Sequence, residues 1–426
     1  MIISINIMIM SASTYKKGDL VENHPFVPGK DKVYYSRAIF GEREIASVLE
    51  CLNNDWLGIG KYTRMFEKQV AEIFGQNFAL FVNSGSSANL LAVRTLLGKA
   101  KHGKVITPAC TFATTVNPLI ESGLVPVFVD VELDTYNIDL DLVEEAIDSN
   151  TVGLMIPHLI GNLNNMARLR RIADDHNLIL IEDSCDSIGG TIRGEPTGKY
   201  ADASTTSFYA SHIITAMGGG GMVMFKYKAD AEFTQAVRDW GRASAEYYDE
   251  HPDIRFNFFL DNIQYDGKFV FRELGFNFKA LDPQAAFGLV QLSRLSEFDQ
   301  IRKRNFKILY DFFAGFPEHF VLPRQAVIES DVRWLAFPLS IRKGSPIKRT
   351  ELMLYLEGRN IQTRVLFAGN ILRHPPYRDI DHFVYGSLIN SDAILAHGFL
   401  IGCHHGLRQE HLDYVMDTVR SYLWKI

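Results

Sequence analysis

The sequence predicts an α/β fold in which a mainly parallel sheet is covered by helices on both faces. Short apolar runs typical of buried strands alternate with amphipathic helical segments between residues 78 and 181, and this alternation is the pattern that such folds produce. Polar motifs directly follow several of these runs, where parallel sheets bind their ligands. With 426 residues, 47% of them hydrophobic, the chain can bury a large core and is long enough for two or three domains.

The elements of this sheet follow one another in a regular order. Two helical segments come first, one within 35–56 that carries Ile45, Val48 and Leu49 at helical spacing, and one around Phe66. The predicted strands are 78–82, 104–108, 125–131, 152–157, 178–181 and 222–225. The predicted helices among them are 83–97, 111–122, 140–147 and 166–176.

The carboxy-terminal part has a mixed pattern that predicts a smaller α+β domain. The segment Gly275–Gly288 is expected to lead into a long helix through Phe312. It is followed by a predicted strand at 334–341, a helix at 348–357, a strand at 362–366 and a terminal helix at 410–423. We expect an amino-terminal extension at 1–34, a large domain with an amino-terminal arm at 35–290, and the linking helix with the small domain at 291–426. Residues 229–271 show no clear pattern.

Composition excludes several classes of protein. A net charge of −6 and a pI near 6.1 leave no basic surplus for nucleic acid. Four cysteines lie far apart, at 51, 110, 185 and 403, which argues against a disulfide framework or a zinc knuckle and favours reduced thiols in the cytoplasm. The apolar segment Met1–Met10 has no basic flank and is too short to span a membrane, and no other run reaches that length. We interpret it as a disordered or packed extension.

Two glycine-containing turns are candidate phosphate sites. Gly85 and Ser86 are expected at the amino terminus of a helix, where free N–H groups and the helix dipole favour an anion, although a plain helix cap is an equal alternative. Ser207 lies in a run of hydroxyl side chains ahead of the glycine run 218–221, whose backbone a phosphate can approach closely. Between them lies His212, which taken alone would be an ordinary buried histidine.

The segment 207–222 resembles the cofactor-lysine segment of the DegT/DnrJ/EryC1/StrS sugar aminotransferases, which use pyridoxal phosphate on nucleotide-activated sugars. That pattern is Ser-Phe, then a lysine five positions after the serine, then Gly-Glu-Gly-Gly; here His212 replaces the lysine and Gly218 the glutamate. A histidine there marks the dehydratase branch of the family, which acts on GDP-4-keto-6-deoxymannose and CDP-4-keto-6-deoxyglucose. The resemblance covers roughly 37–423 and implies fold type I, like aspartate aminotransferase, with a seven-stranded central sheet. It makes 35–290 the cofactor-binding domain.

The resemblance also implies roles for individual residues around the cofactor. Asp183 matches the acid opposite the pyridine nitrogen, where a carboxylate keeps the ring an electron sink; from position alone, a solvated loop acid is as good a reading. Asp186 stands where many relatives carry a glutamine or histidine at the ring hydroxyl. Phe112 matches the aromatic residue that stacks on the ring face, with a core phenylalanine as the alternative. Asn277, in Gly-Phe-Asn-Phe-Lys, matches an asparagine that reaches the phosphate of the neighbouring subunit, so a homodimer with shared active sites is expected.

Without a lysine at position 212, pyridoxal or pyridoxamine phosphate has to bind noncovalently. Histidine has an unperturbed pKa near 6.5, which suits both acid and base work at neutral pH. The implied reaction removes the C3 hydroxyl of a nucleotide-linked 4-keto-6-deoxyhexose, a step of 3,6-dideoxy sugar biosynthesis for lipopolysaccharide O-antigen, with L-glutamate as amino donor. Arg364, Asn370 and Arg373 are candidate substrate contacts, and the pair His404-His405 is left open.

Some relatives in this branch carry an iron–sulfur cluster, but the positions of the cysteines argue against a cluster in this chain. The resemblance places one ligand near Glu-Asp and three just after Trp-Gly-Arg. This chain keeps Cys185 and Trp240-Gly241-Arg242, yet 243–271 contains no cysteine, so we expect no cluster and no metal. Two alternatives stay open: an ordinary aminotransferase, and a cofactor-binding subunit that has lost catalysis.

Overall fold

The computed structural model describes residues 25–54, 56–242 and 251–425. The segment Met1–Met10, interpreted above as an extension, lies outside the described residues. Residues 25–35 contact the carboxy-terminal part of the chain, because the Val33 N–H donates to the Asn360 carbonyl at 2.8 Å and Val33 O accepts from Gln362 N at 2.9 Å. Among the described residues, no helix has the length and apolarity needed to cross a membrane.

The central sheet has eight strands in the order β1-β9-β8-β5-β4-β2-β3-β16. All pairings are parallel except the two that β9 makes with β1 and β8. The strands are β1 (Phe78–Val82), β2 (Lys104–Pro108), β3 (Val125–Val129), β4 (Thr151–Pro157), β5 (Ile179–Asp183), β8 (Ala203–Ser207), β9 (Gly221–Phe225) and β16 (Phe383–Val384). Seven of them correspond to the sheet implied by the resemblance. The eighth, β16, comes from the carboxy-terminal part and pairs with β3.

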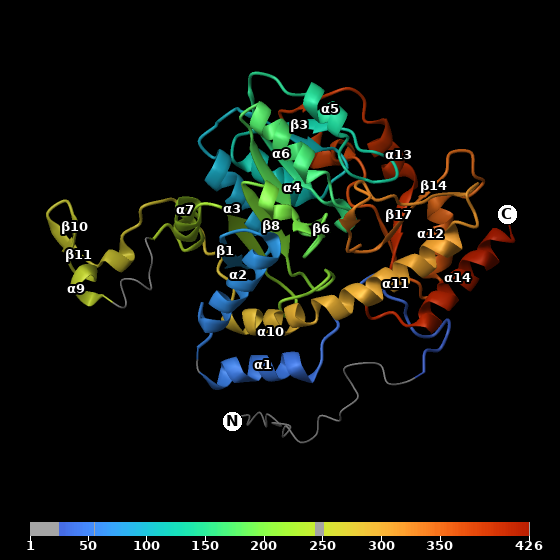
Figure 1. Ribbon diagram of the computed structural model, residues 1–426, viewed down its shortest axis with the longest axis horizontal. Coiled ribbons are helices and arrows are strands. Elements are labelled where there is room, and N and C mark those ends of the chain that lie inside the picture. Colours follow the sequence, from blue (N-terminus) through green and yellow to red (C-terminus); the bar gives the residue numbers. More distant parts are fainter. Residues whose placement is uncertain (1–24, 55, 243–250, 426) are drawn as a thin grey trace, which may run out of the picture.

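Helices pack on both faces of this sheet (Figure 1). Along each strand, side chains alternate between two separate apolar clusters: Ile106 faces the cluster that contains α2, α6 and α10, whereas Val105 faces the cluster that contains α3 and α7. The helices are α1 (Glu42–Asn53), α2 (Lys61–Phe74), α3 (Gly85–Leu97), α4 (Ala113–Glu121), α5 (Leu140–Glu145), α6 (Met166–Asp175), α7 (Lys228–Arg238) and α10 (Asp282–Ser293). The α/β prediction from the strand–helix alternation is confirmed.

The carboxy-terminal part builds a second, antiparallel sheet in the order β12-β14-β17-β15. Its elements are α11 (Leu295–Phe313), β12 (Phe320–Val321), β14 (Phe337–Ile341), α12 (Arg349–Glu357), β15 (Thr363–Val365), α13 (Ile389–His397), β17 (Gly398–Ile401) and α14 (Gln409–Leu423). The single long helix predicted through Phe312 is in fact two helices, α10 and α11, because Arg294 between them has φ −101° and ψ 1°.

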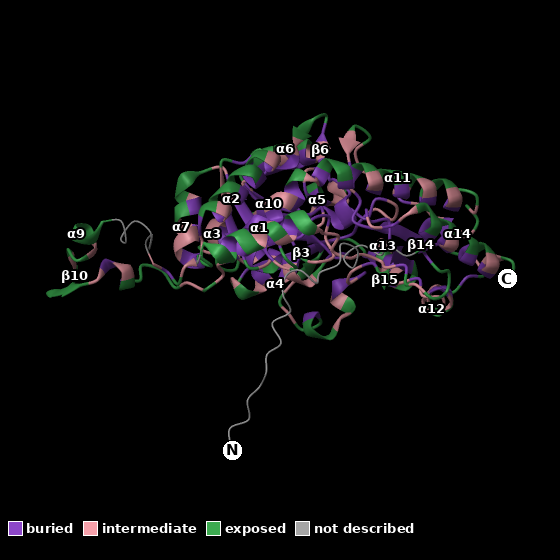
Figure 2. Cartoon of the chain, turned by 90° about the horizontal axis from the view of Figure 1, so that it is seen from below, coloured by how far each residue is buried: buried purple, intermediate pink, exposed green. Residues whose placement is uncertain are grey.

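Smaller elements complete the described chain. They are the three-stranded sheet of β6 (Thr191–Ile192), β7 (Glu195–Pro196) and β13 (Ser330–Asp331), the helix α9 (Pro252–Arg255), and the hairpin of β10 (Phe258–Leu260) and β11 (Ile263–Tyr265). Single 3-10 turns occur at η2 (Leu159–Gly161), η3 (Thr197–Tyr200), η4 (Gly267–Phe269), η5 (Ile371–Arg373) and η6 (Pro375–Tyr377). The α9–β11 segment projects away from the rest of the chain (Figures 1 and 2).

The amino terminus of α2 is capped by a side chain that lies far away in sequence. Its N-cap is Gly60, which has no side chain, so Asp282 at the start of α10 takes that role. Asp282 Oδ1 accepts from Gly60 N at 3.0 Å, Thr63 N at 2.7 Å and Thr63 Oγ1 at 2.7 Å. This buried carboxylate therefore joins α2 to α10.

We expect Asp282→Ala to lower the free energy of unfolding by about 2 kcal/mol, because it leaves three buried donors without an acceptor. Urea unfolding measures the loss. The control is Glu232→Ala, which breaks an exposed ion pair with Lys228 and should cost at most about 0.5 kcal/mol. Equal effects of the two substitutions would show that the cap contributes no more than a surface pair.

Candidate active site

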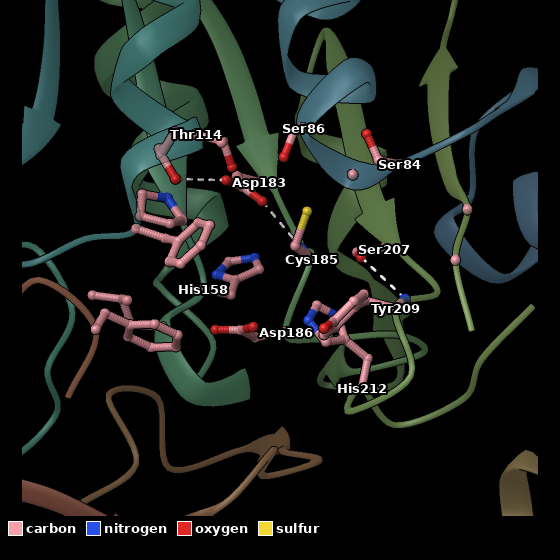
Figure 3. A pocket seen from close by; sticks show the side chains of 18 of the residues that line it. Ser84, Ser86, Thr114, His158, Asp183, Cys185, Asp186, Ser207, Tyr209 and His212 are labelled. Atoms are coloured by element: carbon pink, nitrogen blue, oxygen red, sulfur yellow. Dashed lines mark hydrogen bonds between the residues drawn. The ribbon is translucent and has the colours of Figure 1, made fainter. Parts of the chain in front are cut away.

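Four predicted motifs meet around one cavity of about 310 Å³. The segments 83–86, 112–115, 183–186 and 207–212 line it, each just beyond the carboxyl end of a parallel strand or of β1, and a fifth segment, 157–159, joins them after β4 (Figure 3). The convergence expected from the strand ends is therefore what the structure shows.

At Gly85, in the wall of the cavity, the backbone packs so closely against neighbouring residues that no side chain fits. A Cβ added at Gly85 would lie 2.7 Å from Ser207 Cβ and 2.8 Å from Cys185 Sγ, so only glycine lets the start of α3 sit against β8. The helix cap is Ser84, whose Oγ accepts from Ser87 N at 3.1 Å. Gly85 and Ser86 are the first residues of α3, so their N–H groups have no carbonyl partner within the helix, an arrangement that suits an anion.

Asp183 is fixed in the wall of the cavity by hydrogen bonds. It is 6% exposed, which rules out the solvated loop acid. Its Oδ2 accepts from Asn89 Nδ2 and Thr115 Oγ1, both at 2.8 Å, and its Oδ1 from Cys185 N at 3.1 Å. Thr205 Oγ1 donates to Asn89 Oδ1 at 2.5 Å, so the amide of Asn89 has its N–H₂ group toward Asp183. Three donors therefore fix the orientation of the Asp183 carboxyl group.

Asp186 has a different electrostatic environment. Its Oδ2 accepts from Ile160 N at 3.1 Å. Burial and the nearby Asp183 carboxylate raise the pKa of Asp186 to about 7. The Asp186 carboxyl can therefore hold a proton at neutral pH.

His212 lines the cavity with an unpartnered ring nitrogen. Its Nδ1 is buried and has no hydrogen-bond partner among the described residues. Burial lowers the pKa of His212 to about 4, below the 6.5 assumed from the sequence. The imidazole is therefore neutral at pH 7, the protonation state that a proton acceptor needs.

Phe112 is not a core residue, because it is 53% exposed and its ring borders the cavity. It meets Phe367 edge to face, with ring centroids 6.2 Å apart. These two rings also border an adjoining cavity of about 370 Å³, which is lined in addition by Arg364 and Tyr35. Arg364 is therefore next to the first cavity without lining it.

Three other predicted residues lie elsewhere. Asn370 is buried and uses both ends of its amide inside the protein: Nδ2 donates to Asp392 Oδ1 at 2.8 Å, and Oδ1 accepts from Leu372 N at 3.1 Å. Arg373 is held in an ion pair with Asp392. Asn277 is exposed on the surface of this chain and does not line its cavity.

The histidine pair left open by the sequence belongs to the core. His404 and His405 are both buried, and His405 stacks on Phe298 with ring centroids 3.8 Å apart. Burial lowers the pKa of His404 to about 3, so this ring stays neutral. Neither residue lines the cavity.

Sequence reasoning missed His158, which lines the cavity from the end of β4. Its Nδ1 accepts from Asn164 N at 3.1 Å, so its Nε2 carries the proton and donates to Glu182 Oε1 at 2.9 Å. The other motifs were selected because they follow the carboxyl ends of predicted strands. His158 directly follows the predicted strand 152–157 and could have been selected in the same way. Cys185 also borders the cavity, and burial together with the Asp183 charge raises the pKa of its thiol well above the ordinary value.

Asp186→Asn is expected to stabilise the cofactor-free protein at about pH 8 but not at about pH 4. The folded protein holds this proton up to about pH 7, whereas the unfolded chain releases it near pH 4. As the pH rises from about 4 to about 7, the parent protein therefore loses free energy of folding, whereas the Asp186→Asn variant does not. Urea unfolding of both proteins at the two pH values measures the difference; His212 titrates in both and cancels. A difference independent of pH would contradict the assignment.

The chain resembles known sugar enzymes over nearly its whole length. The sequence profile of the DegT/DnrJ/EryC1/StrS aminotransferase family matches residues 39–420. Lipopolysaccharide biosynthesis protein RfbH of Salmonella typhimurium is 41% identical over 410 residues, 93% of either chain. The dTDP-4-dehydro-2,6-dideoxy-D-glucose 3-dehydratase of Saccharopolyspora spinosa is 38% identical over 415 residues, 95% of this chain and 89% of that one. The E. coli GDP-4-keto-6-deoxy-D-mannose-3-dehydratase with bound hydrated PLP has a TM-score of 0.81 at 26% identity, covering 91% of this chain and 100% of that chain.

Fold and cavity together define a fold type I protein of the pyridoxal-phosphate-dependent class, like aspartate aminotransferase. Within this class, the chain belongs to the DegT/DnrJ/EryC1/StrS aminotransferase family. The resemblance found from the residues around His212 is confirmed, and so is the fold class that it implied.

Proposed function

We propose that the chain is a pyridoxamine-phosphate-dependent 3-dehydratase of a nucleotide-linked 4-keto-6-deoxyhexose. One observation carries the proposal: the position of the family's lysine holds His212, and no lysine lines the cavity in the described part of the chain. The names of two similar proteins, both 3-dehydratases, support it. The reaction belongs to 3,6-dideoxy sugar biosynthesis, which supplies lipopolysaccharide O-antigen.

The residues of the cavity fit pyridoxal or pyridoxamine phosphate held without a covalent bond. The absence of a side chain at Gly85 and the amino terminus of α3 next to Ser207 suit the phosphate, and the Asp183 carboxylate suits a protonated ring nitrogen. Phe112 presents an exposed ring for stacking. When bound, the cofactor supplies an amino group and an electron sink.

His212 is the proton carrier of the proposed reaction. Its neutral imidazole lines the cavity and accepts the proton that the reacting carbon gives up. It then returns this proton to the hydroxyl that leaves carbon 3 of the sugar as water. Asp186 lines the same cavity as Asp183, and its raised pKa of about 7 lets it hold a proton near neutral pH.

The remaining partners follow from the same proposal. The nucleotide sugar enters beside Phe112, where Arg364 lines the adjoining cavity, and L-glutamate restores the amino group. A homodimer would bring Asn277, exposed here, to the phosphate of the second subunit. Four free cysteines favour the cytoplasm. Asn370 and Arg373 are engaged with Asp392 and are weaker candidates for substrate contact than Arg364.

The test is to incubate the protein with pyridoxamine phosphate, L-glutamate and in turn a GDP-, CDP- or dTDP-4-keto-6-deoxyhexose, and to record the mass of the sugar nucleotide. Loss of one oxygen supports the dehydratase. Stoichiometric amino sugar would instead support an aminotransferase, and an unchanged sugar with all three nucleotides would support a cofactor-binding subunit without catalysis.

We also expect no iron–sulfur cluster after anaerobic reconstitution. Cys185 borders the cavity, but residues 243–271 offer no further thiolate. Metal analysis and the visible spectrum after gel filtration measure the outcome. Stoichiometric iron and sulfide that stay with the protein would contradict the prediction and point to a reductase-coupled reaction.

A further inference from the structure

The 3-10 turn Leu159–Gly161 holds Asp186 through an unusual backbone conformation. Ile160 has φ 57° and ψ 18°, a left-handed conformation that β-branched residues rarely adopt. Residues kept in such conformations are held by their surroundings and gather at functional sites. This turn forms part of the wall of the cavity, through Leu159.

Both backbone groups of Ile160 are engaged. Its N–H donates to Asp186 Oδ2 at 3.1 Å, and its carbonyl accepts from Leu335 N at 2.8 Å. The next residue, Gly161, also has a positive φ of 86°, and a Cβ there would lie 2.3 Å from Arg333 O and 3.1 Å from Asp186 O. The turn is thus wedged between the backbone of 333–335 and the backbone of Asp186.

Segment 333–335 is anchored in turn by a buried guanidinium. Arg302 on α11 is 1% exposed and forms no ion pair among the described residues; its Nη1 donates to Trp334 O at 3.2 Å and Leu335 O at 3.0 Å, and its Nε to His405 Nδ1 at 3.2 Å. The peptide unit that accepts at Trp334 O is the one that donates from Leu335 N to Ile160. Hydrogen bonds in such a chain strengthen one another.

We propose that the turn Leu159–Gly161, held by Arg302 through the Trp334–Leu335 peptide, is the positioning element for Asp186. The turn fixes Oδ2 and leaves Oδ1 for the molecule that occupies the cavity, since no described residue bonds to Oδ1. Ile160, Gly161 and Arg302 are therefore positioning residues. The inference rests on the proposed cofactor site but not on dehydration.

The charges of the groups that face Asp186 have to be kept constant in any test. They are Asp183 and Cys185 on its own segment, His158 beyond β4, His212 beyond β8, and Tyr35 of the amino-terminal arm, with Arg302 and Arg364 beside Tyr35. None of them is changed by an alanine at Gly161. A methyl group there forces the turn away from Arg333 and Asp186, which weakens the Ile160 N–H bond to the carboxylate.

The experiment is an absorbance titration of the protein loaded with pyridoxal 5′-phosphate. Asp186→Asn identifies which transition near pH 7 belongs to Asp186, because asparagine abolishes it. Gly161→Ala should move that transition upward by about one pH unit, since a lost hydrogen bond to the charged form raises a pKa by this amount. The matched control is Gly344→Ala, with a similar φ of 90° but nothing within 4 Å; it should leave the transition in place.

Two results would overturn the proposal: the same midpoint in Gly161→Ala as in Gly344→Ala, or a spectral change from Gly161→Ala that persists in an Asp186→Asn background. If Gly161→Ala does not fold, Arg302→Lys decides, because it keeps the charge and loses the fork to the two carbonyls. It should shift the midpoint in the same direction. Arg304→Lys on the same helix, where Arg304 bonds to Asn305, should not, and equal midpoints for both would reject the role of Arg302. Because the titration needs bound cofactor and no turnover, it stands apart from failure of the dehydratase assay.

Discussion

Replacing His212 by asparagine is expected to slow dehydration by about 10²–10⁴-fold, the contribution of a positioned acid or base. The substitution removes the imidazole that lines the cavity and adds no amine. The close packing at Gly85 and the hydrogen-bond donors around Asp183 are left unchanged, so the affinity for the cofactor should stay near that of the parent. Single-turnover assays with a preformed pyridoxamine phosphate complex measure the rate. A near-parental rate would mean that the histidine is not the base, and the mechanism would fail at its centre.

His212→Lys separates loss of the base from gain of an amine. At this position the family's lysine forms a covalent carbon–nitrogen bond with pyridoxal phosphate, and we expect the variant to do so. Borohydride reduction followed by peptide mass analysis should find the cofactor on Lys at this position in the variant and on no lysine in the parent. Dehydration should fall at least as far as in His212→Asn. Cofactor trapped on a lysine of the parent would contradict noncovalent binding.

Local sequence signals were sufficient to predict the scaffold of the site. Apolar runs of strand length that end just before Asn83 and Asp183 gave two of the strand ends, because a buried parallel strand needs an apolar run and its end admits polar groups. Strand β8, which ends at Ser207, is rich in hydroxyl side chains and was not predicted from its sequence. The resemblance then gave these positions chemical roles. What the structure adds is the environment: three donors to Asp183, and burial that moves the pKa of His212 to about 4 and that of Asp186 to about 7.

The features that were missed depend on contacts between distant segments. Strand β16 consists of two exposed residues and exists only because β3 offers an edge. The cap of α2 comes from Asp282, more than two hundred residues away, and Phe367 reaches the cavity from the carboxy-terminal part. The left-handed Ile160 contradicts the preference of its own side chain. These pairings and conformations depend on tertiary packing, so the local periodicity of the sequence cannot predict them.

Asp183→Asn is expected to lower the dehydration rate by about 10²–10³-fold, the scale of removing one preorganised electrostatic contact. An amide carries no charge to hold the ring nitrogen of the cofactor protonated. Part of any loss will be structural, because the new N–H₂ group meets the donors Asn89, Thr115 or the N–H of Cys185.

Asp130→Asn is the matched control for that structural part. Asp130 is 5% exposed and also accepts three hydrogen bonds, from Asn390 N, Ser391 N and Ser391 Oγ, yet it does not line the cavity. Both variants should lose similar free energy of unfolding in urea, about 1–3 kcal/mol for a donor left facing a donor. Only Asp183→Asn should lose turnover at saturating pyridoxamine phosphate. A tenfold difference in rate corresponds to one pKa unit of differential interaction. If the turnover rates of the two variants differ by less than about tenfold, the Asp183 carboxylate has a structural role and no electrostatic role toward the cofactor.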